Sequence, residues 1–288
     1  MTEYLDFIVK DLVATGVDSP LLEAKLLMAE VLHKPLQEIN KDTALSETEF
    51  NEIKNCLKQR KAHKPLDKIL GHRGFFKFDY LVNTDVLTPR PDSEILVEEA
   101  LQLLAEDETG KILDLGTGSG CLIESILSER PLMQGVAVDI SEKALETAEQ
   151  NANILGLDKR ICFLRGDWFS ENFADNFSEK FDIVVSNPPY IPTKDIENLA
   201  PEVRNYDPLS ALDGGEDGYA SYRRIAEIAP LIIKDGGYIL LEAGYGQATE
   251  IVKIFADSGL FWLKTVKDLS GTERCVIMQK AVAQSKKI

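Results

Sequence analysis

The chain has 288 residues, 44% of them hydrophobic, which is enough for one large domain or two ordinary domains with a packed core. It carries 48 acidic and 32 basic residues, and a net charge of −16 disfavours general binding to nucleic-acid backbones. The 4 cysteines and 3 histidines show no ligand spacing, so we expect neither a metal site nor a disulfide framework. No apolar run approaches the ~20 residues of a membrane span and no signal peptide is recognised, so we expect a cytoplasmic protein without membrane contact. We also expect a monomer, although no sequence feature decides the oligomeric state.

Residues 1–73 predict a small helical domain. Apolar residues keep helical spacing in its first segment, which Gly16 ends. Ser19-Pro20 is typical of a helix start, and Ser46 with Glu49 matches a capping box. This domain holds no catalytic constellation.

The segment 54–77 contains 8 basic residues and 1 acidic residue. We favour its interpretation as a solvated helical surface, because most charge runs are of that kind. The alternative is a docking face for an acidic or RNA-containing partner.

The remaining chain predicts a Rossmann-like α/β domain. Alternating aromatic residues predict a β-hairpin connector over 74–87, and the domain proper covers 88–288. It begins with a helix near Ser93, and from Lys111 strands and helices alternate, which predicts a mainly parallel sheet covered on both faces. We expect strands at 111–115, 135–139, 161–165, 181–185, 237–243, 260–266 and 274–279. The last two have no helix between them and are expected to form an antiparallel hairpin at the edge.

The first strand of that domain leads into a glycine-rich turn, Gly116-Thr117-Gly118-Ser119-Gly120. Glycines let a backbone pass close to a ligand, and doubly wound sheets bind cofactors at the carboxyl ends of their strands. Asp139 ends the next strand, where it is placed to accept hydrogen bonds from both hydroxyls of a ribose. These features fit either a nicotinamide cofactor or S-adenosylmethionine.

Two features favour S-adenosylmethionine. The turn has the spacing G-x-G-x-G, which differs from the dinucleotide pattern G-x-G-x-x-G. Asp114 precedes the turn, and we expect it near a ligand ammonium, since it would repel a pyrophosphate. After the third strand, Asp167 is expected to accept from the adenine amino group and Trp168 to pack on the ring, with ordinary core packing as the alternative for Trp168.

A second motif, Ser186-Asn187-Pro188-Pro189-Tyr190, follows the apolar strand 181–185. Its prolines end the strand and stiffen the loop. We expect the Asn187 side-chain oxygen and the Pro188 carbonyl to accept the two N–H bonds of a planar NH2 group, with Tyr190 stacked on that group. Such bonds strengthen as positive charge grows on the nitrogen, so they favour the transition state. A purely structural turn is the alternative interpretation.

The glycine turn, the acid on the next strand and the Asn-Pro-Pro-Tyr sequence resemble the S-adenosylmethionine-dependent amino methyltransferases that modify adenine, cytosine or glutamine NH2 groups. Three further stretches make this resemblance specific to one family: Thr88–Glu94, Ser186–Pro192 and Glu202–Gly218. Together with the helical domain, they make the whole chain similar to the bacterial family of peptide chain release factor glutamine methyltransferases. The sequence departs from the family pattern only by serine in place of threonine at Ser93 and Ser119.

The resemblance implies a translation-termination enzyme that methylates the side-chain amide nitrogen (N5) of the glutamine in the Gly-Gly-Gln motif of release factors. It also implies that residues 1–73 form a substrate-docking domain and that S-adenosylmethionine is converted to S-adenosylhomocysteine. The candidate catalytic residues are Asn187, Pro188 and Tyr190, to which Pro189 is added for substrate binding. The candidate cofactor residues are Gly116, Thr117, Gly118, Ser119, Gly120, Asp139, Asp167, Trp168 and Asn187.

Several interpretations stay open at this point. Arg90 and Glu94 either order the connector, contact the methionine end of the cofactor or form a structural ion pair. Loop 213–218 is expected to cap a helix that begins near Tyr219. An N6-adenine methyltransferase acting on DNA or RNA shares the chemistry, although the acidic charge of residues 81–288 and the lack of a spare basic domain oppose it. A nicotinamide-dependent oxidoreductase and a non-catalytic adaptor are the remaining alternatives.

Overall fold

The computed structural model describes residues 4–282, which divide into two compact units. The first unit comprises the described residues up to His72 together with Ala200–Tyr206. The second comprises Arg73–Leu199 and the described residues from Asp207 onward. Our expected division at residues 73 and 87 does not anticipate that Ala200–Tyr206 folds with the helical unit.

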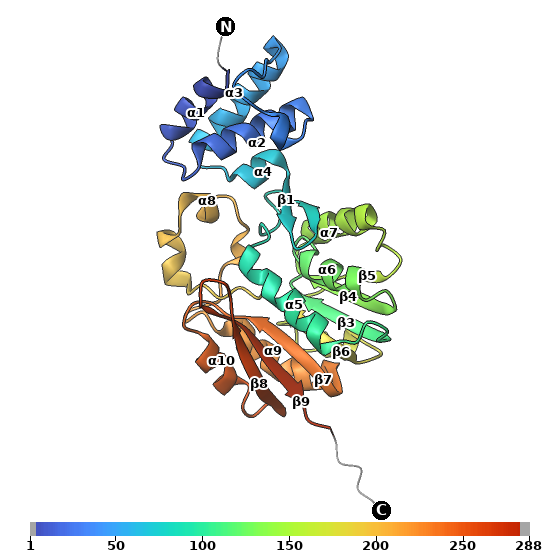
Figure 1. Ribbon diagram of the computed structural model, residues 1–288. Coiled ribbons are helices and arrows are strands. Elements are labelled where there is room, and N and C mark those ends of the chain that lie inside the picture. Colours follow the sequence, from blue (N-terminus) through green and yellow to red (C-terminus); the bar gives the residue numbers. More distant parts are fainter. Residues whose placement is uncertain (1–3, 283–288) are drawn as a thin grey trace, which may run out of the picture. The chain divides into compact units, whose positions relative to one another are not determined.

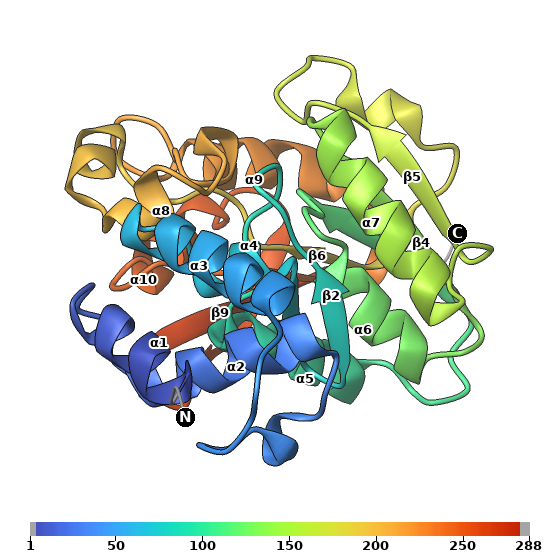
Figure 2. The same cartoon turned by 90° about the horizontal axis from the view of Figure 1, so that it is seen from above.

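The first unit is helical (Figure 2). Its helices are α1 (Tyr4–Val13), α2 (Pro20–Leu32), α3 (Glu47–Lys61), α4 (Leu66–Leu70) and α8 (Pro201–Arg204). Buried side chains such as Ile8, Leu27 and Ile53 form its core. The predicted capping box is confirmed, because Ser46 Oγ accepts from the Glu49 N–H at 3.3 Å and the Glu49 carboxylate accepts from the Ser46 N–H at 2.6 Å.

We call Ala200–Tyr206 the strap, and polar contacts, some of them partly buried, attach it to the helices. Arg60 of α3 is only 9% exposed and pairs with Glu23 at 2.9 Å and with Glu202 of the strap at 3.4 Å. The Tyr206 hydroxyl donates to the Ala62 carbonyl at 2.7 Å, and Lys68 Nζ donates to the Tyr206 carbonyl. The chain segment that follows the second motif therefore returns to the helical unit.

Several cations of the basic segment 54–77 form contacts within the protein, both partly buried and at the surface. Besides the two cations that hold the strap, Lys61 pairs with Asp11 at 2.6 Å and Lys77 pairs with Glu129 at 2.8 Å. The two interpretations of the segment, a solvated helical surface and a docking face, both stay predictions.

The second unit contains a β-hairpin and a large sheet (Figure 1). Its strands are β1 (His72–Phe75), β2 (Phe78–Leu81), β3 (Gly110–Leu115), β4 (Met133–Asp139), β5 (Ile161–Arg165), β6 (Phe181–Ser186), β7 (Ile233–Glu242), β8 (Leu260–Lys267) and β9 (Glu273–Lys280). Within residues 4–282, a 7-stranded sheet has the order β5-β4-β3-β6-β7-β9-β8. Strands β3 to β7 are parallel, whereas β9 is antiparallel to both β7 and β8. The predicted fold class is confirmed, including the antiparallel edge hairpin.

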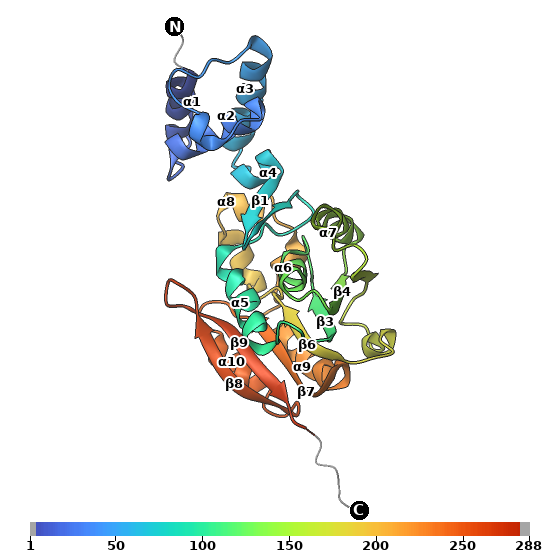
Figure 3. The same cartoon turned by 45° about the vertical axis from the view of Figure 1, so that its right-hand side comes forward.

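Helices cover both faces of this sheet (Figure 3). They are α5 (Glu94–Leu103), α6 (Cys121–Glu129), α7 (Glu142–Leu155), α9 (Ala220–Ile232) and α10 (Ala248–Ile254). Leu96 of α5 and Ile126 of α6 belong to the core on one face, and Ile225 of α9 and Ile251 of α10 belong to the core on the other. The hairpin expected as a connector packs into the first of these cores through Tyr80. Among residues 4–282, none of the helices is long and apolar enough to cross a membrane.

The strand order reverses between β3 and β6, which makes their carboxyl ends the expected ligand site of a doubly wound sheet. The glycine turn follows β3 and the second motif follows β6, so the two motifs meet at this point. Ser186 Oγ, at the end of β6, donates to the Leu115 carbonyl at the end of β3 at 2.6 Å. This buried bond holds the two strand ends together.

Candidate active site

A cavity of about 220 Å³ lies at this reversal point and is lined entirely by the second unit. The predicted site residues on its lining are Gly116, Thr117, Gly118, Ser119, Asp139, Asp167, Trp168, Asn187 and Pro189. Three predicted residues are not on the lining. Gly120 precedes α6, Pro188 is buried within its loop, and the Tyr190 hydroxyl points toward Glu242.

The glycine turn needs its glycines for two different reasons. Gly116 has φ of 77°, and a Cβ there would meet the Trp168 ring at 3.0 Å. Gly118 has φ of 56° and no atom within 4 Å of its Cβ position, so its backbone borders open space. A side chain at Gly116 would therefore displace the Trp168 ring, and one at Gly118 would project into the cavity with unfavourable backbone geometry.

Asp139, at the end of β4, is hydrogen-bonded to the glycine turn. Its Oδ2 accepts from the Gly118 N–H at 2.9 Å, and its Oδ1 accepts from the Ser141 N–H at 2.9 Å. Burial raises the pKa of Asp139, while these N–H bonds oppose that rise. A carboxylate has about four lone-pair positions, so Asp139 keeps capacity to accept from further donors such as hydroxyl groups.

Asp167 and Trp168 follow β5. Asp167 is exposed, and its Oδ1 accepts from the Phe169 N–H at 2.9 Å. Trp168 lines the cavity and also packs against the sheet core. Its packing on an adenine ring stays a prediction. Its buried Nε1 has no hydrogen-bond partner within the described part of the chain.

Sequence reasoning missed the apolar wall of the cavity. Val86, Leu87, Ile140 and Phe169 contribute to it, and the last two are 51% and 52% exposed. Ile140 directly follows Asp139 at the end of β4, and Phe169 lies two residues after Asp167, beyond the end of β5. Neither residue belongs to the apolar pattern that predicts the core of the sheet. A large apolar residue just after a candidate acid was the sequence signal that could have identified this wall.

Asp114 does not lie where the sequence argument placed it. The residue is fully buried and absent from the cavity lining, and its Oδ2 accepts from Thr117 Oγ1 at 2.8 Å. Burial raises the pKa of Asp114 to about 7. Because the strand register turns its side chain inward, Asp114 supports the glycine turn from the protein interior and does not face the ligand site.

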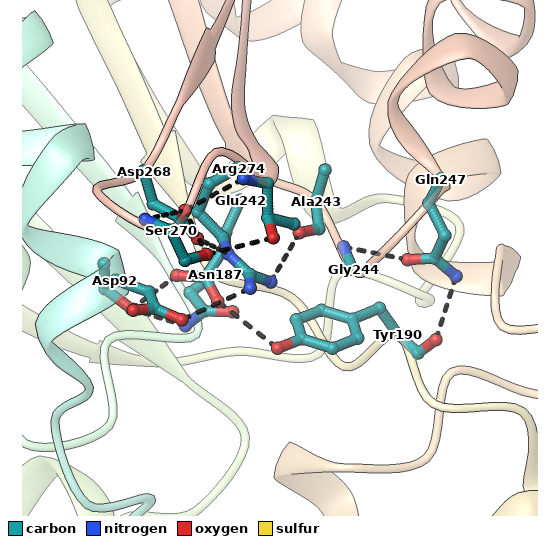
Figure 4. Close-up of polar contacts among 12 residues, drawn as sticks. Asp92, Asn187, Tyr190, Glu242, Ala243, Gly244, Gln247, Asp268, Ser270 and Arg274 are labelled. Carbon is teal, nitrogen blue, oxygen red and sulfur yellow. Dashed lines mark hydrogen bonds and ion pairs between the residues drawn. The ribbon is translucent and has the colours of Figure 1, made fainter.

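The Asn187 side chain belongs to a buried polar network (Figure 4). Its Nδ2 donates to Ser93 Oγ at 3.2 Å, and Ser93 Oγ donates to Glu242 Oε2. The Tyr190 hydroxyl donates to Glu242 Oε1 at 3.4 Å. None of residues 4–282 forms a hydrogen bond to Asn187 Oδ1, so this oxygen keeps its capacity to accept from a ligand.

Glu242 is the centre of this network, and sequence reasoning missed it. It ends β7 and is only 2% exposed. Burial raises the pKa of Glu242 to about 7, against the effects of Ser93 and of the Arg274 charge. A charged residue directly after the apolar run Tyr238–Leu241, at the carboxyl end of the strand, was the sequence signal for it.

Loop 213–218 supports the second motif from its carboxyl side. The Gly214 N–H donates to the Ile191 carbonyl at 2.8 Å. A Cβ at Gly214 would lie 2.7 Å from Tyr190 Cα, and a Cβ at Gly218 would lie 2.5 Å from the Tyr190 carbonyl oxygen. The glycines of this loop are therefore required for close backbone approach, in addition to the expected position of the loop before α9.

Arg90 and Glu94 have separate structural contacts. Arg90 lines the cavity and pairs with Asp207 at 3.0 Å. Glu94 Oε1 accepts from the Phe76 N–H at 3.0 Å, where Phe76 adopts φ of 54° in the hairpin turn. Glu94 thus orders the hairpin, and Arg90 forms an ion pair at the cavity edge.

A cavity with an acid at the end of β4, an apolar wall and an oriented amide at the end of β6 suits a nucleoside-containing methyl donor beside a planar acceptor. Within residues 4–282 there is no group of three His, Cys, Asp or Glu side chains placed to hold a metal ion. The fold and the site together define a methyltransferase with a Rossmann-like sheet.

Comparisons with known proteins identify the family. The family described as Methyltransferase small domain matches residues 92–202, and the PrmC N-terminal domain matches residues 3–71. A release factor glutamine methyltransferase from Rhodospirillum rubrum is 41% identical over 93% of this chain and 81% of its own length. One from Caulobacter vibrioides is 39% identical over 94% of this chain and 93% of its own length. The chain belongs to the release factor glutamine methyltransferase family.

A solved structure supports the fold assignment. The crystal structure of a methyltransferase from Pyrococcus furiosus matches with a TM-score of 0.51 and 18% identity, covering 72% of this chain and 91% of that one. The predicted family resemblance and enzyme class are confirmed by the relatives, which imply a methyl donor of the S-adenosylmethionine type. These relatives do not favour the alternative of a DNA or RNA methyltransferase.

Proposed function

We propose that this protein transfers a methyl group from S-adenosylmethionine to the side-chain N5 of the glutamine in the Gly-Gly-Gln motif of peptide chain release factors. S-adenosylhomocysteine is the second product. The observation that carries the proposal is the Asn187 amide, whose nitrogen is held by Ser93 at 3.2 Å while its oxygen remains available beside the cavity. The names of the relatives support the choice of substrate.

The residues of the cavity fit the proposed cofactor. The remaining lone pairs of Asp139 suit two ribose hydroxyls, and Asp167 suits the adenine amino group. The wall formed by Val86, Ile140 and Phe169 suits the adenine ring. When bound, S-adenosylmethionine supplies an electrophilic methyl group on a sulfonium ion.

Asn187 and Pro188 provide the chemistry on the acceptor side. An amide nitrogen is a poor nucleophile because its lone pair is delocalised into the carbonyl. In the proposed mechanism, Asn187 Oδ1 and the Pro188 carbonyl accept its two N–H bonds and fix the face that it presents. These bonds strengthen as positive charge develops on nitrogen, so they stabilise the transition state without a general base acting beforehand.

The rest of the second motif preorganises this geometry. Pro188 and Pro189 restrict the loop, and the loop 213–218 packs on its carboxyl side, so little ordering remains when the acceptor binds. Tyr190 is held through its hydroxyl by Glu242, and in the proposed complex its ring stacks on the planar acceptor.

We assign docking of the release factor to the helical unit, supported by its match to the PrmC N-terminal domain. In this proposal the enzyme acts as a monomer in the cytoplasm, where release factors work. Direct binding of DNA plays no part.

Mass spectrometry of the release-factor Gly-Gly-Gln peptide tests the proposed function. The full-length protein is incubated with labelled S-adenosylmethionine and either a release factor or duplex DNA. We expect one methyl group on the glutamine and no label on DNA. Label on DNA alone would overturn the proposal.

Replacing Asp139 with alanine should weaken binding of S-adenosylhomocysteine about 10- to 100-fold. Each hydrogen bond from a ligand to a charged group contributes about 1.5–3 kcal/mol, and the variant also removes the acceptor of the Gly118 N–H. Isothermal titration calorimetry measures the affinity, with the exposed Asp158→Ala as the matched control. Equal affinities for Asp139→Ala and wild type would contradict the assigned role of Asp139.

A further inference from the structure

We propose that Ser93 and Glu242 are positioning residues that set the direction of the Asn187 amide, turning its oxygen toward the acceptor nitrogen. The proposal rests on the proposed function, because it concerns the same acceptor group. Ser93 lies just before α5, Glu242 ends β7 and Asn187 follows β6, and the hydrogen bonds of Ser93 to the other two residues bring these three segments together. Figure 4 shows Asn187 and Glu242 in this arrangement.

The direction follows from the number of protons on a serine hydroxyl. Ser93 Oγ has one proton and two lone pairs, and in this structure it donates the proton to Glu242 Oε2. The oxygen can then only accept from Asn187, so the amide nitrogen must face it, at 3.2 Å. If the amide were reversed, two oxygens without a proton between them would face each other.

The second oxygen of Glu242 reinforces this arrangement. It accepts from the Tyr190 hydroxyl at 3.4 Å, so an ionised Glu242 orients two residues of the second motif at once. Glu242 is only 2% exposed, so both contacts are shielded from bulk solvent. The adjacent Arg274 favours the ionised form, and it is itself fixed by Asp268 at 3.3 Å.

Protonation of Glu242 removes the constraint. A carboxylic acid can donate to Ser93 Oγ, which frees the serine proton for Asn187 Oδ1. The Asn187 amide can then turn its nitrogen toward the substrate amide. The N–H groups of Asn187 and of the substrate would then face each other, and no hydrogen bond could form between them.

The resulting pH dependence has a defined sign. Burial raises the pKa of Glu242 to about 7, so methyl transfer should fall as the pH drops below about 7. The titratable and charged groups that act on Glu242 or respond to its charge come from several elements: Arg274, Asp92, Tyr190, Tyr222, Cys121 and Cys275. Glu242 is the carboxylate that contacts both Ser93 and Tyr190, so its replacement isolates the effect.

Rates of methyl transfer to a release factor at saturating substrates, measured between about pH 6 and pH 9, test the proposal. We expect Ser93→Ala to lower kcat about 10- to 100-fold, as misplacement of a reacting group typically does, and Ser93→Thr to restore most of it. Glu242→Gln should lower kcat and flatten the fall at low pH. The matched control is Ser125→Ala, which removes a buried serine hydroxyl bonded to Tyr80 at 2.9 Å, away from the cavity.

Binding of S-adenosylhomocysteine and thermal unfolding of each variant separate positioning from a general structural role. The proposal requires both to stay close to wild type in Ser93→Ala. Wild-type kcat and pH profile in Ser93→Ala would overturn it. Failure of Ser93→Thr to restore activity would overturn it as well, because the hydroxyl would then not be the active feature.

A readout without substrate distinguishes this proposal from the proposed function. The side-chain amide signal of Asn187 in ¹⁵N NMR should shift with pH in the wild type and stay constant in Glu242→Gln. If the wild type transfers no methyl group to a release factor, the proposed function fails, and the NMR titration still decides the proposal. A signal that does not respond to pH in the wild type would overturn it.

Discussion

Replacing Asn187 with alanine is expected to lower the rate of methyl transfer about 10²–10³-fold, the usual cost of removing one preorganised group that contacts developing charge. The affinity for S-adenosylhomocysteine should change far less, because most of the cavity lining comes from other segments. Single-turnover transfer to a release factor measures the rate, and calorimetry measures the affinity.

The matched control is Asn198→Ala, an exposed asparagine further along the same connection. It should retain wild-type activity. A wild-type rate in Asn187→Ala would refute the role of the amide and would favour the interpretation of the second motif as a structural turn. Loss of cofactor binding in step with activity would instead assign Asn187 to the cofactor.

Replacing Glu124 with glutamine is expected to stabilise the protein by about 3 kcal/mol at pH 7. Glu124 lies on α6 with 0% exposure, and neither of its carboxylate oxygens has a hydrogen-bond partner within the described residues. Burial, with a smaller effect of the Asp114 charge, raises the pKa of Glu124 to about 9 from an ordinary 4.5. Each pH unit between those values costs about 1.4 kcal/mol of folding free energy.

The sign of this effect fixes its pH range. Between about pH 4.5 and pH 9 the folded state keeps a proton that the unfolded state has lost, so the Glu124 contribution to stability falls as pH rises. Glutamine carries no such proton, so the advantage of the variant should be small near pH 5 and should grow toward pH 8. Urea unfolding at several pH values measures the difference.

The exposed Glu146→Gln on α7 is the matched control, since surface substitutions usually change stability by less than about 0.5 kcal/mol. Parallel pH curves for wild type and Glu124→Gln would show that Glu124 does not keep its proton in the folded protein. A variant that is less stable at every pH would show that the carboxyl group makes a contact that glutamine cannot replace.

The sheet could be predicted because its strands are encoded locally. The apolar run ending at Val185 and the alternation of strands with helices define β6 and its neighbours, and Asp139 follows from its place at the end of β4. Both motifs at the reversal point could be found in the same way, since each directly follows its strand.

The network behind Asn187 could not be predicted, because it depends on tertiary pairing. Ser93 and Glu242 are far apart in the sequence from each other and from Asn187, and no spacing rule connects them. Asp114 shows the opposite difficulty, since its position in the sequence was clear but the direction of its side chain was not. A residue at a strand end points either into the cavity or into the core, and only the folded strand decides which.

The strap has a consequence for the modularity of this enzyme. The chain leaves the helical unit at His72 and returns for Ala200–Tyr206, so a gene fragment ending at His72 would encode α3 without one of the carboxylates that pair with Arg60. Exchange of the helical segment between two relatives must therefore transfer a matching strap, which lies only a short distance after the Asn-Pro-Pro-Tyr sequence. In recombination between relatives, we therefore expect the helical segment and the strap to function only as a matched pair.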